Sequence, residues 1–333
     1  MIELKSDALV FSFPEVHSDA VLRVDFQRTL RIPDDGSDYP LPPGLGRFPL
    51  RHVDDFARRV SERWIERGGV MLPMYQSEAL WLNFTDTRGY PFAVKVAAGK
   101  VNAVTGDPWA DSVNRDPQDY LVVPEQPWLD GYCVEKGLIR QFVAMPLGSG
   151  YSAEEQITGT AEQGGIQIIA YPMKREAYER IRSRMAEGPE PAAYEVACYS
   201  MSVDMGLAPG GRMRQDVYDD PHTFGDWDTK HANRCFVHLG NSLVWQAVTG
   251  GPPPTVPPTS DEYTRAGLPW FEYYGGDLQA LEGSETLEGL KSVTQMGTEK
   301  GDVPLPENVS VSPDNVIALR KGLRKDQVRE GVF

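Results

Sequence analysis

The sequence predicts an α+β fold of predominantly antiparallel β-sheet, sandwich-like or curved, with two main helices and a long C-terminal arm. Apolar residues recur at a spacing of two through most of residues 1–249, as in strands with one buried face. Short glycine-containing turns favour hairpins over the helical crossovers of a parallel sheet. Only two segments have helical spacing, so we expect about twelve strands with two helices on one side of them.

The first half of the chain alternates predicted strands with one helix. The helix is expected at His52–Arg67, where apolar residues recur on one face and Gly68-Gly69 would end it. Gly99-Lys100 should form a type II′ hairpin turn, because glycine occupies the first central position. The predicted strands are Ala8–Phe13, Val21–Phe26, Thr29–Ile32, Val70–Pro73, Ala79–Phe84, Phe92–Ala98 and Val101–Thr105.

The second half repeats this pattern around a second helix. Pro172–Glu187 has proline at its first turn and Gly188 just beyond its end, which are common helix boundaries. A second hairpin is predicted where Arg234–Leu239 and Leu243–Val248 flank a polar turn. The other predicted strands are Leu138–Met145, Gly165–Tyr171 and Ala193–Met201.

Composition divides the chain into three parts. Residues 1–249 form the β-rich globular body, and residues 250–259, which are rich in proline, form a stiff polyproline-type spacer. Residues 260–333 form the C-terminal aromatic segment and extended arm, with a short helix expected after the cap Ser260. Because the end of this arm is polar and aperiodic, order there requires contact with the body or with a neighbouring subunit.

Charge and composition exclude several classes of function. The chain has 48 acidic and 33 basic residues, a net charge of −15, so we expect no binding to nucleic acid or to anionic membranes. No secretory signal and no apolar run of membrane-spanning length is visible, and Cys133, Cys198 and Cys235 are widely separated. These features predict a cytoplasmic protein with reduced cysteines.

Sequence motifs for common cofactors are missing. There is no P-loop, no dinucleotide-binding G-x-G-x-x-G, no haem motif, no G-x-S-x-G and no H-E-x-x-H. Enzymes that depend on nucleotides or on a serine nucleophile elbow are therefore disfavoured.

One acidic loop, residues 216–228, could bind a metal. Ca²⁺ and Mg²⁺ prefer several carboxylate and carbonyl oxygens from a flexible loop. The spacing matches no EF-hand, so the alternative is a polar surface loop whose aspartates form Asx turns. The candidate ligands are Asp219, Asp220, His222, Asp226 and Asp228.

Two further segments could form binding sites. Arg140 and Gln141 point to opposite faces of a predicted strand, and a buried arginine would need a carboxylate such as Glu154 or Glu155. That pair could recognise a ligand carboxylate or could simply stabilise the fold. The second segment follows the spacer and could either cover the protein's own sheet or anchor another subunit; it contains Trp270, Phe271, Tyr273 and Tyr274.

Two hypotheses about function follow. The first is a non-enzymatic binding or self-assembly protein, with a protein partner or a second copy held by the C-terminal arm. The alternative is a divalent-metal-dependent hydrolase that uses the Asp/His loop at 216–228. No residue pattern identifies a reaction, a substrate or a known family.

Overall fold

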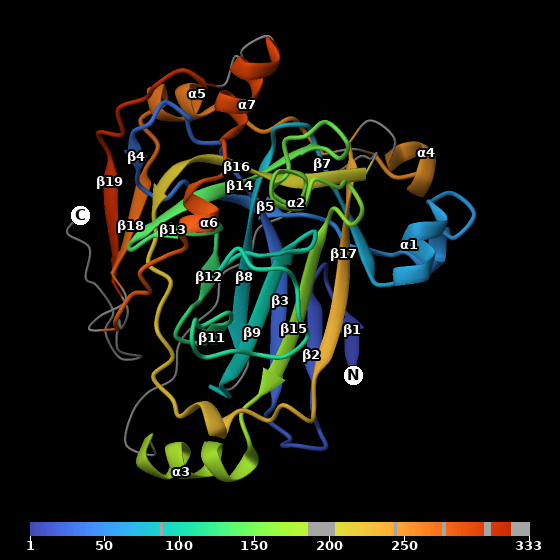
Figure 1. The fold of residues 1–333 in the computed structure, drawn as a ribbon, viewed down its shortest axis with the longest axis vertical. Helices are drawn as coiled ribbons and strands as arrows, with labels where there is room; N and C mark the ends of the chain where they lie inside the picture. Colours follow the sequence, from blue (N-terminus) through green and yellow to red (C-terminus); the bar gives the residue numbers. More distant parts are fainter. Residues whose placement is uncertain are drawn as a thin grey trace, which may run out of the picture.

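The computed structural model describes residues 1–86, 89–185, 204–242, 245–252, 254–274, 278–302 and 308–320. Strands make up 38% and helices 18% of these described residues, so sheet dominates. Most strand pairs among these residues are antiparallel, and three are parallel. The prediction of a mainly antiparallel α+β fold is therefore confirmed. Figure 1 shows long central strands with helices at their ends and sides.

The first group of strands is centred on β3 (Val21–Thr29) and β8 (Ala79–Asp86). They pair from Leu22↔Asp86 to Thr29↔Ala79, and the apolar residues Leu22, Val24 and Phe26, at every second position of β3, are fully buried. That alternation is the period of two that predicted the strand. The remaining strands of this group are β1 (Ile2–Leu4), β2 (Leu9–Ser12), β5 (Gly44–Arg47) and β12 (Trp128–Leu129).

The second group is centred on β9 (Phe92–Ala98) and β15 (Ile166–Pro172), which pair along their whole length. The predicted hairpin at Gly99 is confirmed, because β9 turns directly into β10 and Gly99 has φ +58°. The other members are β6 (Arg51–His52), β7 (Val70–Met74), β10 (Val101–Asn102), β11 (Leu121–Val123) and β17 (Asn233–Asn241).

Two long strands connect these groups. β14 (Leu138–Pro146) pairs with β8 and with β16 (Asp204–Arg214), and β16 in turn pairs with β17. In Figure 1 they cross the upper ends of the central strands. β4 (Asp38–Tyr39) and β13 (Gly131–Glu135) complete a connected set of 17 strands. One apolar cluster contains residues of both groups, so they share a core.

The helices are short and lie around the sheet. α3 is the longest and lies below the sheet in Figure 1, whereas α1 and α4 lie at its right, so the helices do not share one side. The α-helices are α1 (Glu62–Arg67), α2 (Ala153–Thr158), α3 (Arg175–Met185), α4 (Trp245–Thr249), α5 (Ser260–Arg265), α6 (Glu285–Glu288) and α7 (Val293–Lys300), and the 3₁₀ turns are η1 (Asp54–Phe56) and η2 (Phe224–Asp226).

The predicted helix His52–Arg67 is wrong in its first part. His52 pairs with Val70 in the short β6–β7 ladder, so the sheet takes the residues that were expected to begin the helix. Helix α1 starts only at Glu62 and buries Trp64. The second predicted helix is confirmed but starts at Arg175, because Pro172 remains in β15 opposite Phe92.

The predicted hairpin after β17 is also wrong. Its second strand, Leu243–Val248, is replaced by α4. Trp245 and Val248 are three residues apart on that helix, and both pack in a small apolar cluster with Trp64. This local contact satisfies their burial without a strand. The predicted strand Ala193–Met201 and Cys198 lie outside the described residues.

The C-terminal arm packs against the body. Strand β18 (Trp270–Tyr274) pairs in parallel with β19 (Val316–Arg320), and Phe271 forms a bridge with Leu41 of the body. Trp270 and Leu287 belong to the same apolar cluster as the central strands. The division into body, spacer and arm stays a prediction.

The segment at 250–259 is tied to the body by hydrogen bonds. Arg28 Nη2 donates to the carbonyl of Thr255 at 2.8 Å, and Tyr75 Oη donates to the carbonyl of Pro254 at 2.7 Å. Arg28 itself is buried and paired with buried Glu78. The cap of α5 is Thr259 rather than Ser260, and its side chain forms a capping box with Glu262.

Candidate binding surface on the C-terminal arm

The acidic loop at 216–228 is organised around a buried carboxylate. Asp220 Oδ2 accepts hydrogen bonds from Tyr120 Oη at 2.6 Å and from Trp227 Nε1 at 2.9 Å. Arg115 pairs with the same carboxylate at 2.9 Å. Burial, followed by the bond to Asp220, raises the pKa of Tyr120, so this tyrosine remains a donor. Asp220 thus holds the loop together through protein donors.

The other predicted metal ligands have separate partners. Asp219 lies 3.5 Å from Arg115, and Asp226 accepts from Arg180 at 2.7 Å. Burial alone would raise the pKa of Asp228, but hydrogen bonds donated by His231 and by nearby backbone amides lower it overall. Among the residues that the structure describes, no group of three His, Cys, Asp or Glu could hold a metal ion.

His222 is the one predicted ligand with an unusual environment. Its Nε2 lies 3.9 Å from Glu125 Oε1, too far for a hydrogen bond. Both Nε2 and Glu125 Oε2 are buried without a hydrogen-bond partner. A single bridging water would satisfy two such groups.

The predicted segment around Arg140 is divided between unrelated contacts. The carboxylate nearest to Arg140 is Asp34, 4.0 Å away, and not Glu154 or Glu155 as expected. Gln141 is fully buried and bonds the backbone of Leu30 and Ile32. These contacts hold the segment that follows β3 against β14.

Glu154 and Glu155 serve the loops around α2. Glu154 is buried and accepts from the backbone amides of Gln163 and Gly164, while burial raises its pKa. Glu155 completes the capping box of α2 with Ser152.

Three aromatic residues of β18, Trp270, Phe271 and Tyr273, pack against the protein's own core. Trp270 is completely buried, with its ring 6.2 Å from that of Tyr39, and its Nε1 donates to Thr264. The half-buried Tyr273 ring stands edge-on to Trp128 at 4.6 Å. Phe271 is half-buried beside Leu41, and Tyr274 ends the strand. This strand therefore anchors the arm.

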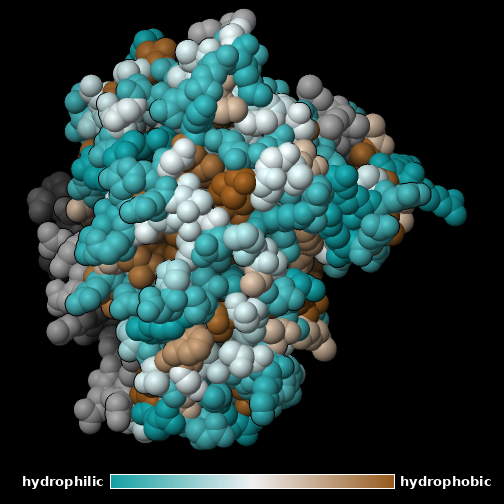
Figure 2. Space-filling view, in the orientation of Figure 1, coloured by the Kyte–Doolittle hydropathy of each residue, from teal (hydrophilic) through white to brown (hydrophobic). Residues whose placement is uncertain are grey.

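The next strand, β19, is exposed on both faces. Val316, Ile317 and Leu319 are 40%, 43% and 39% exposed, and Ala318 is exposed as well. Five of the eight large apolar side chains exposed among the described residues lie in the arm: Leu268, Val309, Val316, Ile317 and Leu319. The face of the molecule in Figure 2 is by contrast mostly hydrophilic.

β19 also forms an open sheet edge. Within the described part of the chain it pairs only with β18, and it is the outermost strand at the left of Figure 1. An unpaired edge presents backbone donors and acceptors to solvent. The unbroken apolar run Val316–Leu319, preceded by Pro313-Asp314, is a strand signal that sequence reasoning missed.

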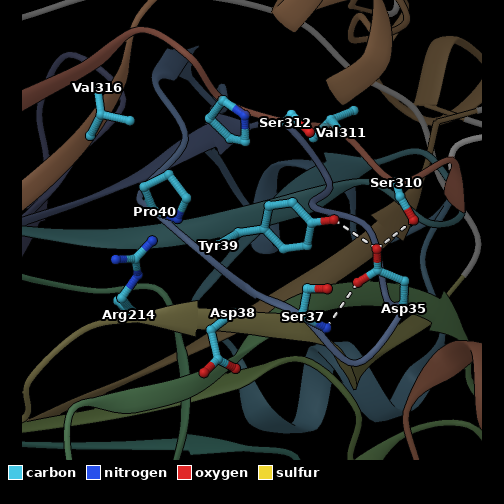
Figure 3. Close-up of a pocket in the computed structure, with 11 residues that line it drawn as sticks. Asp35, Ser37, Asp38, Tyr39, Pro40, Arg214, Ser310, Val311, Ser312 and Val316 are labelled. Atoms are coloured by element: carbon cyan, nitrogen blue, oxygen red, sulfur yellow. Dashed lines mark hydrogen bonds between the residues drawn. The ribbon is translucent and has the colours of Figure 1, made fainter.

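A polar groove of about 490 Å³ adjoins the start of β19. Figure 3 shows Asp35 at one end, accepting hydrogen bonds from Tyr39 Oη at 2.8 Å and Ser310 Oγ at 2.5 Å. Burial, helped by Asp35, raises the pKa of Tyr39 to about 12. These bonds fix the segment that leads into β19, because they tie Ser310 to the body.

Comparison with family models, with curated proteins and with solved structures finds no match to this chain. No helix among the described residues is long and apolar enough to cross a membrane.

Proposed function

We propose that this is a non-enzymatic binding protein whose C-terminal arm takes up an extended segment of a partner protein along β19. The observation that carries the proposal is the open edge of β19 together with its exposed apolar side chains. Strand addition uses these two features together, since the main-chain bonds give affinity and alternate side chains give specificity.

The position of β19 supports this role. Natural proteins protect sheet edges with short strands, charges, prolines or covering elements. β19 instead presents Ile317 and Leu319 at the edge without a charge between them. Two anchors hold the strand in place. Trp270, on the paired strand β18, lies in the core, and Ser310, six residues before β19, bonds Asp35.

The geometry does not favour the hydrolase hypothesis. The predicted carboxylate ligands Asp220, Asp226 and Asp228 are bonded to arginine, tyrosine, tryptophan and histidine donors. A metal would have to displace these bonds, and burying the freed cationic and polar donors is costly.

Selection of displayed random peptides on the full-length protein tests the proposal. Peptides enriched on the wild type should alternate apolar residues, and they should lose binding to Ile317→Lys, which places a charge at the edge. Val256→Lys is the matched control, because Val256 is 72% exposed and lies outside the arm. The proposal fails if no peptide is enriched, or if the enriched peptides bind wild type and Ile317→Lys equally.

A further inference from the structure

We infer that the segment taken up by β19 is β19 of a second copy of this chain, paired antiparallel about a two-fold axis at Ala318. The inference rests on the proposed binding function and names its partner. It is carried by the composition of the strand, the charges at its two ends and the way in which a two-fold pair closes open edges.

A two-fold pair closes both open edges in one contact. Each copy contributes β18 and β19, so the pair would be a four-stranded sheet with the two β19 strands at its centre. Isologous contacts of this kind close after two subunits, whereas a contact between different surfaces leaves an edge open for further growth. The pair therefore needs no surface other than β19.

The side chains of β19 are complementary to themselves in this register. Ile317 of one copy lies opposite Leu319 of the second copy, and the reverse pair occurs across the axis. These residues are two apart on one strand and share a face, so four apolar side chains meet there. Ala318, the smallest residue of the strand, lies at the axis where the two backbones meet.

Charge selects the antiparallel direction. Asp314 precedes β19 by two residues and is exposed, whereas Arg320 ends the strand. Antiparallel pairing brings the acidic start of one strand toward the basic end of the other, but parallel pairing would align Arg320 with Arg320. The basic character is local: residues 316–333 hold five Lys or Arg and two acids, although acids outnumber basic residues 48 to 33 in the chain.

The contact should be weak and concentration-dependent. Five paired residues form a strip only about 17 Å long. The area that this strip buries is smaller than the roughly 800 Å² per partner of a standard stable interface. A reversible monomer–dimer equilibrium is therefore the expected behaviour, rather than a permanent dimer.

Cysteine cross-linking of the full-length chain tests the register. Residues that face each other in an antiparallel pair have Cα atoms about 4.5–5.5 Å apart, within the range of about 4.4–6.8 Å for a disulfide. Ala318→Cys should form a covalent dimer on mild oxidation. Val316→Cys is the matched control, because the two copies of position 316 would lie about 14 Å apart.

The parent chain provides the blank, since its described cysteines, Cys133 and Cys235, are buried. Equal cross-linking at positions 316 and 318 would indicate parallel pairing or random collision and would overturn the inference. No cross-linking of Ala318→Cys above the parent would overturn it as well.

Sedimentation velocity over protein concentrations of about 1–100 μM gives an independent readout. The weight-average mass should rise toward that of a dimer in the wild type and in Val256→Lys, and should stay monomeric in Ile317→Lys. A wild type that is monomeric throughout removes the second copy as partner. If displayed peptides still bind that monomer through Ile317, the proposed function survives; if they do not, both fall.

Discussion

Replacing Glu78 by glutamine should change how the stability of this protein depends on pH. Burial raises the pKa of Glu78 from 4.5 to about 7, against the opposing effect of Arg28 and of the amide of Tyr75. The folded state thus binds a proton at Glu78 more tightly than the unfolded state does. This contribution to stability is complete below pH 4.5, and it is lost as the pH rises through 7.

The size of the effect follows from the pKa difference. Each pKa unit corresponds to about 1.4 kcal/mol, so Glu78 accounts for a loss of about 3 kcal/mol in the free energy of unfolding. The side chain is completely buried, and solvent screening does not reduce this figure appreciably. The same carboxylate orients Arg28, which bonds the carbonyl of Thr255, so this site also anchors the segment leading to the arm.

Urea unfolding of wild type and Glu78→Gln at several pH values between about 4 and 8 measures this contribution. The stability of wild type minus that of Glu78→Gln should fall by about 3 kcal/mol across this range. Other groups, such as Asp130 with its pKa raised by burial to about 7, titrate in both proteins and cancel in the difference. A difference that is constant, or that grows with pH, would refute the reasoning.

Three further substitutions test the packing described above, each by chemical denaturation with circular dichroism as the check of folding. Trp270→Ala should lower the free energy of unfolding by about 3–5 kcal/mol, because it empties a fully buried site where the arm packs on the core; a loss below about 1 kcal/mol would mean that the arm is not packed on the core. Gly69→Ala should cost about 2 kcal/mol or more, since Gly69 has φ +83° and an added Cβ would lie 2.1 Å from the carbonyl of Phe236; a neutral effect would contradict that approach. Asp220→Ala should cost about 3 kcal/mol, as it leaves the buried hydroxyl of Tyr120 without its acceptor; unchanged stability would show that the loop is not organised by Asp220.

Burial of His238 gives a pH dependence of the opposite sign. Burial lowers its pKa from 6.5 to about 4, where it stacks on Trp64 at 4.6 Å. Its contribution to stability is therefore present above pH 6.5 and is lost as the pH falls toward 4. His238→Phe should remove this part of the acid sensitivity in the same urea experiment; an unchanged acid limb would contradict the assignment.

Local pattern was a good guide to the central strands and a poor guide to their surroundings. β9, β14 and β15 were predicted because each is a run of adjacent, mostly apolar residues, a pattern that is visible locally in the sequence. His52 and Trp245 were misplaced because each is recruited by distant residues, Val70 in one case and Trp64 in the other. Helical or alternating spacing alone could not reveal those contacts.

The candidate site depended even more on long-range contacts. The sequence pointed to the acidic loop and to the aromatic segment, since charge and aromatic clusters stand out in a linear chain. The structure gives the carboxylates protein partners and buries Trp270, whereas among the described residues the apolar side chains of β19 stay exposed. Its five residues had a strand signal, but nothing local marked the strand as an open edge.

By itself the sequence determined an acidic chain, the period-two strands of the body and the glycine turn between β9 and β10. These properties depend on side-chain chemistry and on backbone conformations of adjacent residues. Only the tertiary structure decided which edge stays open, because Trp270 and Val316 become neighbours only after the chain between them closes into a loop. The same closure decides which charged groups find partners and which apolar side chains remain in water.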